Sequence, residues 1–149
     1  YSNEDGINSR LDEIQASILN FKLPLIEKFI LRRRNIAKLY FNELKSTKLK
    51  LPELRKYSEH VFHLFTVYHP KREQIVRELK NQSIETRIIY PYPIHKMDAY
   101  KKFFKNNKKL KNSKNKSKGI FCLPIYPELK NTEVISICDN IKKILKKIK

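Results

Sequence analysis

The spacing of apolar positions divides the chain into helical and strand-like stretches. Leu11, Ile14 and Ile18 recur at intervals of three and four, which predicts a helix over 10–22 with an apolar stripe for packing. Pro24 is expected to break or kink this helix, because proline lacks a backbone donor and clashes with the preceding turn. A longer helix is predicted over 24–46. Its expected buried face consists of Ile26, Phe29, Ile30, Ile36, Ala37, Tyr40 and Leu44.

Three short stretches rich in β-branched and aromatic residues predict strands over 61–68, 84–89 and 120–123. The first is apolar on both faces, so we expect it to be central and covered. Further helices are predicted over 70–80, 97–104 and from Asn131 or Thr132 to near the end of the chain. The last helix should bury Val134, Ile137, Cys138, Ile141, Ile144, Leu145 and Ile148. Residues 105–118 are of low complexity and are expected to form a flexible loop.

This order of elements predicts the α+β class: a small, three-layer-like domain with a short mixed sheet and packed helices. A length of 149 residues fits one domain, 1–149. No apolar run approaches the roughly 20 residues of a membrane-spanning helix, so no membrane association is expected. The first residues show neither a starting Met nor a signal-peptide pattern, so we expect a fragment of a longer protein without a signal peptide.

Composition excludes several classes of protein. Two glycines leave no room for a Gly-rich phosphate loop, and no G-x-S-x-G elbow exists. Cys122 and Cys138 lie in apolar contexts without a C-x-x-C pattern, so we expect neither a disulfide framework nor a metal site. A reduced, cytoplasmic setting is the expectation that follows.

The net charge of +18 raises the alternative of a basic module that binds polyanions. Nine lysines fall between Lys101 and Lys118, but after Phe104 no arginine or aromatic residue is interleaved with them. The chain is also rich in Lys, Asn and Ile together, which A/T-biased codons produce without selection for binding. A solvated loop is therefore favoured, nucleic acid is not expected as a partner, and a modest steering field for an anionic substrate stays open.

Candidate polar residues separate into structural and site-lining groups. His60 and His63 are expected on opposite faces of a strand, satisfied by their neighbours, and His69 at its exposed end. The triplet Arg32–Arg34 is interpreted as a solvated turn with snorkelling stems. Tyr90 and His95 flank a rigid proline loop, where site and structural roles are equally open.

The segment from Gly6 to Ala16 carries the most information. Gly6 permits a bend, Asn8 or Ser9 suits a helix N-cap, and Asp12 falls in the first turn. An amide and the Arg10 guanidinium ahead of a packed helix could hold an anion such as a phosphate. A capped surface helix is the simpler interpretation.

Five blocks of this chain, in order, also resemble the DegT/DnrJ/EryC1/StrS family of sugar aminotransferases. The blocks are Gly6-Ile7-Asn8-Ser9-Arg10-Leu11-Asp12 with Gln15-Ala16, Arg33-Arg34-Asn35-Ile36-Ala37-Lys38-Leu39-Tyr40, His60-Val61-Phe62-His63-Leu64-Phe65, Tyr90-Pro91-Tyr92-Pro93-Ile94-His95, and Leu123-Pro124-Ile125-Tyr126-Pro127. Each block is a weak signal by itself, and the five in sequence are specific. They cover nearly the whole chain except 101–118.

The resemblance implies an enzyme dependent on pyridoxal phosphate (PLP) that moves an amino group from glutamate to a keto-sugar nucleotide, for surface-glycan or secondary-metabolite synthesis. It implies a homodimer whose sites are built from both subunits, and a chain similar to the C-terminal small domain of fold-type I PLP enzymes. Asn8 is then expected at the cofactor phosphate of the neighbouring subunit, and Arg10 at the substrate or the external aldimine. Tyr90 and, less directly, His95 would line the sugar-nucleotide pocket.

Two departures limit what the resemblance implies. Ile89 stands where many members have His before Tyr-Pro, which puts one sugar-nucleotide contact in doubt. The lysine that carries PLP lies upstream of the matched blocks, so no catalytic residue is assigned and the fragment by itself is expected to be inactive. A PLP-dependent sugar dehydratase relative remains an alternative, and the upstream lysine would decide between them.

Overall fold

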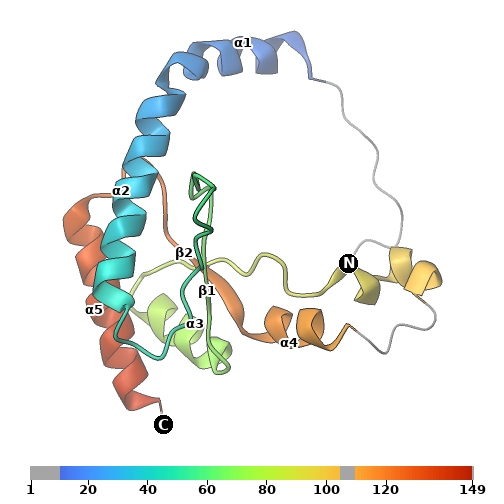
Figure 1. Cartoon of the computed structure of the whole chain (residues 1–149), viewed down its shortest axis with the longest axis vertical. Coiled ribbons are helices and arrows are strands. Elements are labelled where there is room, and N and C mark those ends of the chain that lie inside the picture. Colours follow the sequence, from blue (N-terminus) through green and yellow to red (C-terminus); the bar gives the residue numbers. More distant parts are fainter. Residues whose placement is uncertain (1–10, 105–109, 149) are drawn as a thin grey trace.

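The computed structural model describes residues 11–104 and 110–148 (Figure 1). Helices make up most of the described residues, together with one short pair of strands. In chain order the elements are α1 (Glu13–Lys22), η1 (Leu23–Leu25), α2 (Ile26–Leu44), β1 (Phe65–Tyr68), α3 (Arg72–Asn81), η2 (Ile94–Lys96), η3 (Asp98–Phe104), α4 (Lys111–Gly119), β2 (Ile120–Leu123) and α5 (Asn131–Lys147), where η marks 3-10 helices. The predicted α+β class is confirmed in this coarse form.

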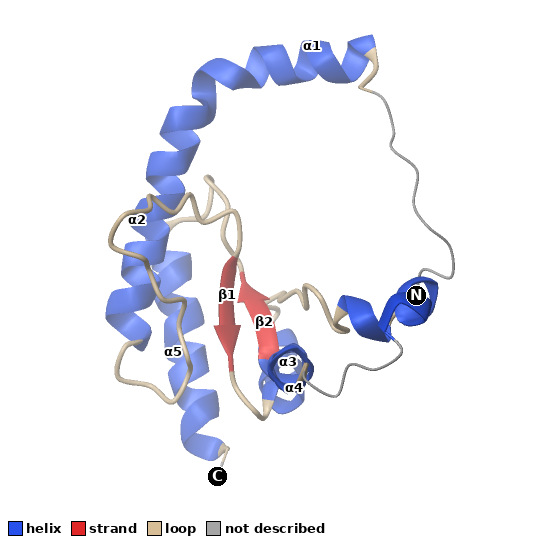
Figure 2. Cartoon of the chain, turned by 45° about the vertical axis from the view of Figure 1, so that its right-hand side comes forward, coloured by secondary structure: helices blue, strands red, loops and turns tan. Residues whose placement is uncertain are grey.

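The sheet is a two-stranded antiparallel pair rather than the predicted short mixed sheet (Figure 2). Its register pairs Phe65 with Leu123 and Tyr68 with Ile120. The predicted strand 61–68 is too long at its start, because Phe62 has a φ of 49°, which extended backbone does not adopt. The predicted strand 84–89 is wrong: it contributes a single bridge, in which Arg87 exchanges both backbone hydrogen bonds with Cys122.

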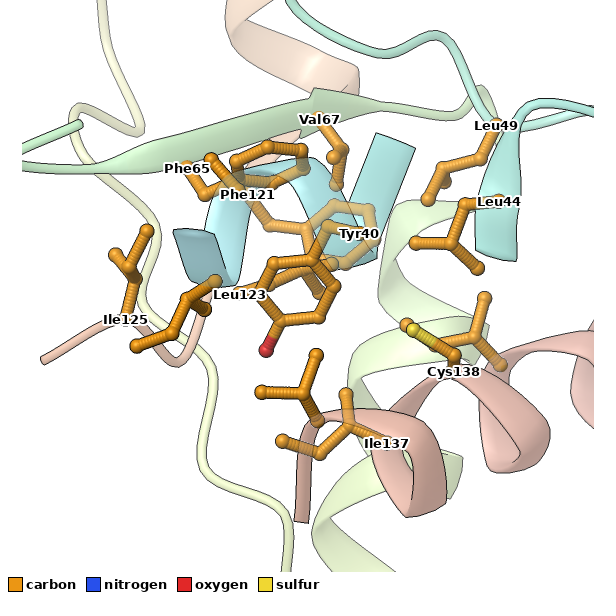
Figure 3. Close-up of a cluster of buried hydrophobic side chains, with 14 of the residues drawn as sticks. Tyr40, Leu44, Leu49, Phe65, Val67, Phe121, Leu123, Ile125, Ile137 and Cys138 are labelled. Carbon is orange, nitrogen blue, oxygen red and sulfur yellow. The ribbon is translucent and has the colours of Figure 1, made fainter. Parts of the chain in front are cut away.

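One hydrophobic core joins the sheet to α2, α3 and α5 (Figure 3). Phe65 and Val67 point into it from β1, whereas Thr66 and Tyr68 are only half-buried, so β1 is covered fully on one face. Tyr40 is fully buried at the centre, with its ring 4.9 Å from that of Phe65. Its hydroxyl donates a hydrogen bond of 2.7 Å to the Pro124 carbonyl, which ties α2 to the end of β2.

The two long helices follow their predicted apolar faces over most of their length. In α2 the buried residues are Ile36, Ala37, Tyr40 and Leu44, but Ile26 is exposed. In α5 Val134, Ile137, Cys138, Ile141 and Ile144 are buried, as predicted. The cap of α5 is Lys130 rather than Asn131 or Thr132, and the Glu133 carboxylate accepts a hydrogen bond of 2.7 Å from the Lys130 N–H.

The bend predicted at Pro24 is confirmed, since η1 separates α1 from α2. Two details of α1 differ from the prediction. Its N-cap is Asp12, whose side chain accepts from the Gln15 N–H at 2.9 Å, so neither Asn8 nor Ser9 fills that place. No residue of α1 is buried, and the predicted packing stripe lies exposed on a helix that projects from the core (Figure 1).

The flexible loop predicted over 105–118 is wrong for its second part, because 111–119 forms α4. Residues 105–109 lie outside the described residues. The helix ends at Gly119, where a Cβ would lie 2.8 Å from the His69 carbonyl oxygen and collide with the Tyr68 ring. Gly119 therefore packs closely against Tyr68 of β1, at the end of a helix that low complexity did not predict. The predicted short helix 97–104 is the 3-10 helix η3.

Candidate functional site

The Tyr90–His95 loop stands out from the rest of the fold. Pro91 and Pro93 restrict its backbone, and Pro93 is the N-cap residue of η2. Tyr90 keeps 70% of its surface exposed. His95 is half-buried, and its ring meets that of Phe104 edge-on at 6.1 Å. The loop thus holds one exposed phenol and one supported imidazole on the same short segment.

Tyr90 and His95 line one cavity of about 630 Å³. The loop forms one wall and α4 forms the other. The loop, η2 and the residue after η2 contribute Tyr90, Tyr92, Pro93, Ile94, His95 and Met97. The rest of the lining is Phe104 of η3, Ser113, Lys116 and Ser117 of α4, and the residues that flank α4, Leu110 and Ile120. The structure therefore brings together the two predicted substrate-binding residues that it describes, and adds α4, which sequence reasoning had treated as a loop. Their roles toward a ligand stay predictions.

Asn8 and Arg10, the predicted cofactor and substrate contacts, lie outside the described residues. The nearest described element is α1, which begins three residues after Arg10. The role of Gly6 in a bend is likewise not tested.

Arg32, Arg33 and Arg34 each donate hydrogen bonds to backbone carbonyls that are distant in sequence, and we call them the arginine clamps. Their interpretation as a solvated turn is wrong. Arg33 donates through Nη1 to the carbonyl of Ile125 at 2.8 Å and to those of Phe62 and His63 at 3.3 and 3.2 Å. Arg34 donates to the His60 carbonyl and forms an ion pair of 2.7 Å with Glu59.

Arg32 holds the segment that leads into α5. It donates to the carbonyls of Pro127 and Leu129 and to Asn131 Oδ1, the last at 2.8 Å. Pro127 and Leu129 lie in the irregular segment between β2 and α5, so their carbonyls do not take part in the hydrogen bonds of a helix or a strand. The guanidinium groups satisfy them, and no local sequence signal identifies such distant acceptors.

A second cavity, of about 810 Å³, opens beside this clamp. It lies between the 83–89 segment, the turn after β2 and the first part of α5. Its lining includes six large polar or charged side chains: Arg33, His63, Glu85, Arg87, Tyr126 and Glu133. Sequence reasoning had proposed none of them as site residues.

The other histidines have structural surroundings. His60 Nδ1 accepts the Phe62 N–H at 2.8 Å, as expected for a residue satisfied by its neighbours, although His60 and His63 lie ahead of the strand rather than on its two faces. His69 is buried, not exposed, and its Nδ1 accepts the Lys71 N–H at 3.1 Å. Burial first, and then the charges of Lys71 and Lys48, lower the pKa of His69.

The described lysines do not fit the role of a cofactor-bearing lysine. Such a lysine needs a desolvated position that favours its neutral form. Among the lysine side chains that the structure describes, Lys142 is the least exposed, and its ammonium group pairs with the Glu43 carboxylate at 2.6 Å. That hydrogen bond raises the pKa of Lys142 and so stabilises the charged form. Lys142 therefore does not meet this requirement.

The comparison with family models decides the relationship. The model of the DegT/DnrJ/EryC1/StrS aminotransferase family matches residues 1–142. The chain belongs to this family. The match includes the Tyr90–His95 loop, the arginine clamps and the segment that carries Asn8 and Arg10, so the predicted resemblance is confirmed.

Curated relatives of this chain include sugar transaminases of greater length. The chain is 32% identical over 145 residues to the dTDP-3-amino-3,4,6-trideoxy-alpha-D-glucose transaminase of Micromonospora megalomicea, covering 94% of this chain and 39% of that protein. It is 36% identical to the dTDP-3-amino-3,6-dideoxy-alpha-D-galactopyranose transaminase of Aneurinibacillus thermoaerophilus, covering 93% and 38%. The chain thus spans about two fifths of the length of the relatives that it matches.

Solved structures of family members share this fold. DesV of S. venezuelae, in complex with a ketimine intermediate, superposes with a TM-score of 0.88 at 29% identity, over 100% of this chain and 41% of that chain. A DegT/DnrJ/EryC1/StrS aminotransferase from Brucella abortus gives a TM-score of 0.85 at 31% identity, over 94% and 37%. No helix within the described residues is long and apolar enough to span a membrane.

Proposed function

We propose that residues 1–149 are the C-terminal small domain of a PLP-dependent nucleotide-sugar aminotransferase. The intact enzyme transfers an amino group from glutamate to a keto-sugar nucleotide, works as a cytoplasmic homodimer, and is inactive when reduced to this part. The family match over residues 1–142 carries the proposal. The transaminases named above act on dTDP-sugars, and a 31% identical relative from Acidithiobacillus ferrooxidans is a UDP-N-acetyl-3-dehydro-alpha-D-glucosamine 3-aminotransferase.

The proposed roles divide the work between two segments. Asn8 contacts the cofactor phosphate across the subunit interface, and Arg10 holds the substrate. Tyr90 and His95 bind the sugar nucleotide from the rigid loop, where the exposed Tyr90 hydroxyl can donate or accept a hydrogen bond with a sugar hydroxyl or phosphate oxygen. Bound PLP supplies the electron sink for moving the amino group, and the protein supplies binding and orientation.

Steady-state kinetics of the intact enzyme test the loop. Tyr90→Phe and His95→Ala should each raise KM for the nucleotide sugar by about 10-fold, the loss of one hydrogen bond to a charged or polar group. The matched control is Tyr57→Phe, because Tyr57 is fully exposed and lies outside the cavity. An unchanged KM in both loop variants would remove Tyr90 and His95 from the proposed pocket.

Cofactor retention and product analysis test the remaining parts. Asn8→Ala should lower PLP occupancy after dialysis, whereas full occupancy would exclude Asn8 from the phosphate contact. Mass spectrometry of the product separates the two PLP reactions, since a transaminase forms an amino sugar and a dehydratase relative removes a hydroxyl without adding nitrogen. A deoxy product lacking added nitrogen would overturn the proposed reaction.

A further inference from the structure

The cavity between the Tyr90–His95 loop and α4 has a positively charged lining. Among its described lining residues there is one lysine, Lys116, and there is no aspartate, glutamate or arginine. The ion pairs found in residues 11–104 and 110–148 do not include Lys116. Its side chain is exposed, so the ammonium group is accessible to an anionic ligand in the cavity.

Contacts from α3 and β1 fix the end of α4 that carries Lys116. The buried Arg72 side chain donates through Nη1 to the Ser117 carbonyl at 2.6 Å and to the Ile120 carbonyl at 3.3 Å. Lys116 Nζ lies 5.2 Å from the centroid of the Tyr68 ring, a distance at which the ring attracts a cation. The backbone beside Lys116 and its ammonium group are therefore both held in place, which reduces the entropy lost when a ligand binds.

A second lysine adds to the positive potential at the same ring. Lys50 exchanges both backbone hydrogen bonds with Tyr68, and its Nζ lies 5.8 Å from the centroid of the Tyr68 ring. Two ammonium groups near one ring repel each other, and an anion with more than one negative charge relieves that repulsion. Lys50 is not among the described lining residues, so Lys116 is the one of the two that contacts a ligand inside the cavity. This arrangement favours a diphosphate over a neutral or singly charged group.

The rest of the lining suits the nucleoside that a diphosphate carries. The volume of about 630 Å³ lies within the range of about 300–1,000 Å³ that is typical of small-molecule sites. Tyr90, Tyr92 and Phe104 bring aromatic rings to the lining, and such rings bind bases by stacking. On the α4 side, Ser117 Oγ already donates to the Lys114 carbonyl at 3.0 Å. The cavity therefore combines a phosphate-binding charge with surfaces for a flat base.

We propose that Lys116 binds the diphosphate of the nucleotide sugar, with the nucleoside against the aromatic part of the lining. This proposal rests on the proposed function, because it takes the nucleotide sugar as the ligand of this cavity. The ammonium group donates charge-assisted hydrogen bonds to the phosphoryl oxygens. The other described lysines of α4, Lys111, Lys114 and Lys118, do not line the cavity, so the contact is specific to one position on the helix.

Calorimetric titration of the intact PLP-loaded enzyme with dTDP, UDP, thymidine and uridine tests this contact. Lys116→Met should weaken the tighter-binding diphosphate by about 10-fold to 100-fold and its nucleoside by less than about 2-fold, because methionine keeps the apolar stem and removes the donor. Lys116→Arg keeps the charge and should restore most of the affinity. The matched control is Lys114→Met, which removes the same charge from the same helix outside the cavity and should change the dissociation constant by less than about 2-fold.

Two results would overturn the assignment of Lys116. Equal losses in Lys114→Met and Lys116→Met would mean that the general positive field of the chain attracts the diphosphate. Equal losses for diphosphate and nucleoside in Lys116→Met would mean that the lysine shapes the cavity without contacting phosphate.

Steady-state kinetics separate this proposal from the proposed function. In Lys116→Met, KM for the nucleotide sugar should rise by the same factor as the dissociation constant of the diphosphate, and kcat should stay within about 2-fold. An amino-sugar product formed with unchanged KM would reject Lys116 and retain the function. Diphosphate binding that depends on Lys116, with no amino sugar formed from dTDP-linked or UDP-linked keto-sugars, would retain Lys116 and reject the function. An unmodified enzyme that binds neither dTDP nor UDP would reject both.

Discussion

Replacing Arg33 by Met tests whether the arginine clamp stabilises the fold. Methionine retains an apolar stem for packing and removes every donor. One Nη1 atom has two hydrogens for three carbonyls, so the 2.8 Å bond to Ile125 and one shared bond are lost. Hydrogen bonds from a charged donor contribute about 1.5–3 kcal/mol each. Because Arg33 is half-buried, we expect a combined loss of about 2–3 kcal/mol.

Urea unfolding followed by circular dichroism measures this loss. With a slope of about 2 kcal/mol per molar for a domain of this size, the midpoint should fall by about 1–1.5 M. Arg34→Met is the matched control, since its ion pair joins a partly exposed guanidinium to a Glu59 side chain that is 85% exposed and contributes about 0–1 kcal/mol. A loss below about 0.5 kcal/mol for Arg33→Met, or one equal to the control, would refute the clamp.

Three further predictions concern close packing and burial. Gly119→Ala should cost about 2–3 kcal/mol, because its methyl group meets the His69 carbonyl oxygen and the Tyr68 ring, whereas Ser113→Ala on the same helix should change urea stability little. The lowered pKa of His69 means that the folded state binds a proton less readily than the unfolded chain, so the free energy of unfolding should fall as the pH drops below the ordinary value of 6.5. His69→Asn should reduce this fall between pH 7.5 and 5. An unchanged dependence of stability on pH in that variant would contradict the assignment. Burial first, and then the charge of Glu43, raise the pKa of the Cys138 thiol to about 12. In a Cys122→Ser variant, which leaves Cys138 as the one thiol, a thiol-reactive dye should therefore label Cys138 about 100-fold faster after unfolding than before it. Rapid labelling of the folded protein would exclude this burial.

Much of the fold could be predicted because its signals are local. The apolar stripe of α5, the break at Pro24 and the strand 120–123 each depend on residues within one or two turns of one another. The errors fall where distant groups decide the conformation. The strand predicted at 84–89 has the right composition, yet pairs only through Arg87. The segment predicted as a loop becomes α4, where Gly119 packs against β1.

The candidate site divides in the same way. Tyr90 and His95 could be named from the proline loop and the family resemblance, and the structure places them at one cavity. The α4 wall of that cavity could not be named, because its serines and lysines resemble a solvated surface in sequence. The buried environment of His69 was also missed, since nothing adjacent to Pro70 indicates what packs over it.

The sequence by itself determined the family, the helical stripes and the residues on the proline loop, because repeating intervals and ordered motifs are properties of the chain that need no partner. Only the tertiary structure decided which carbonyls Arg32 and Arg33 satisfy, how many of the described strands pair, and that the predicted apolar stripe of α1 lies exposed outside the core. The physical reason is that an apolar or charged side chain specifies a need for burial or for a hydrogen-bond partner. The fold determines which surface or acceptor, distant in sequence, meets that need.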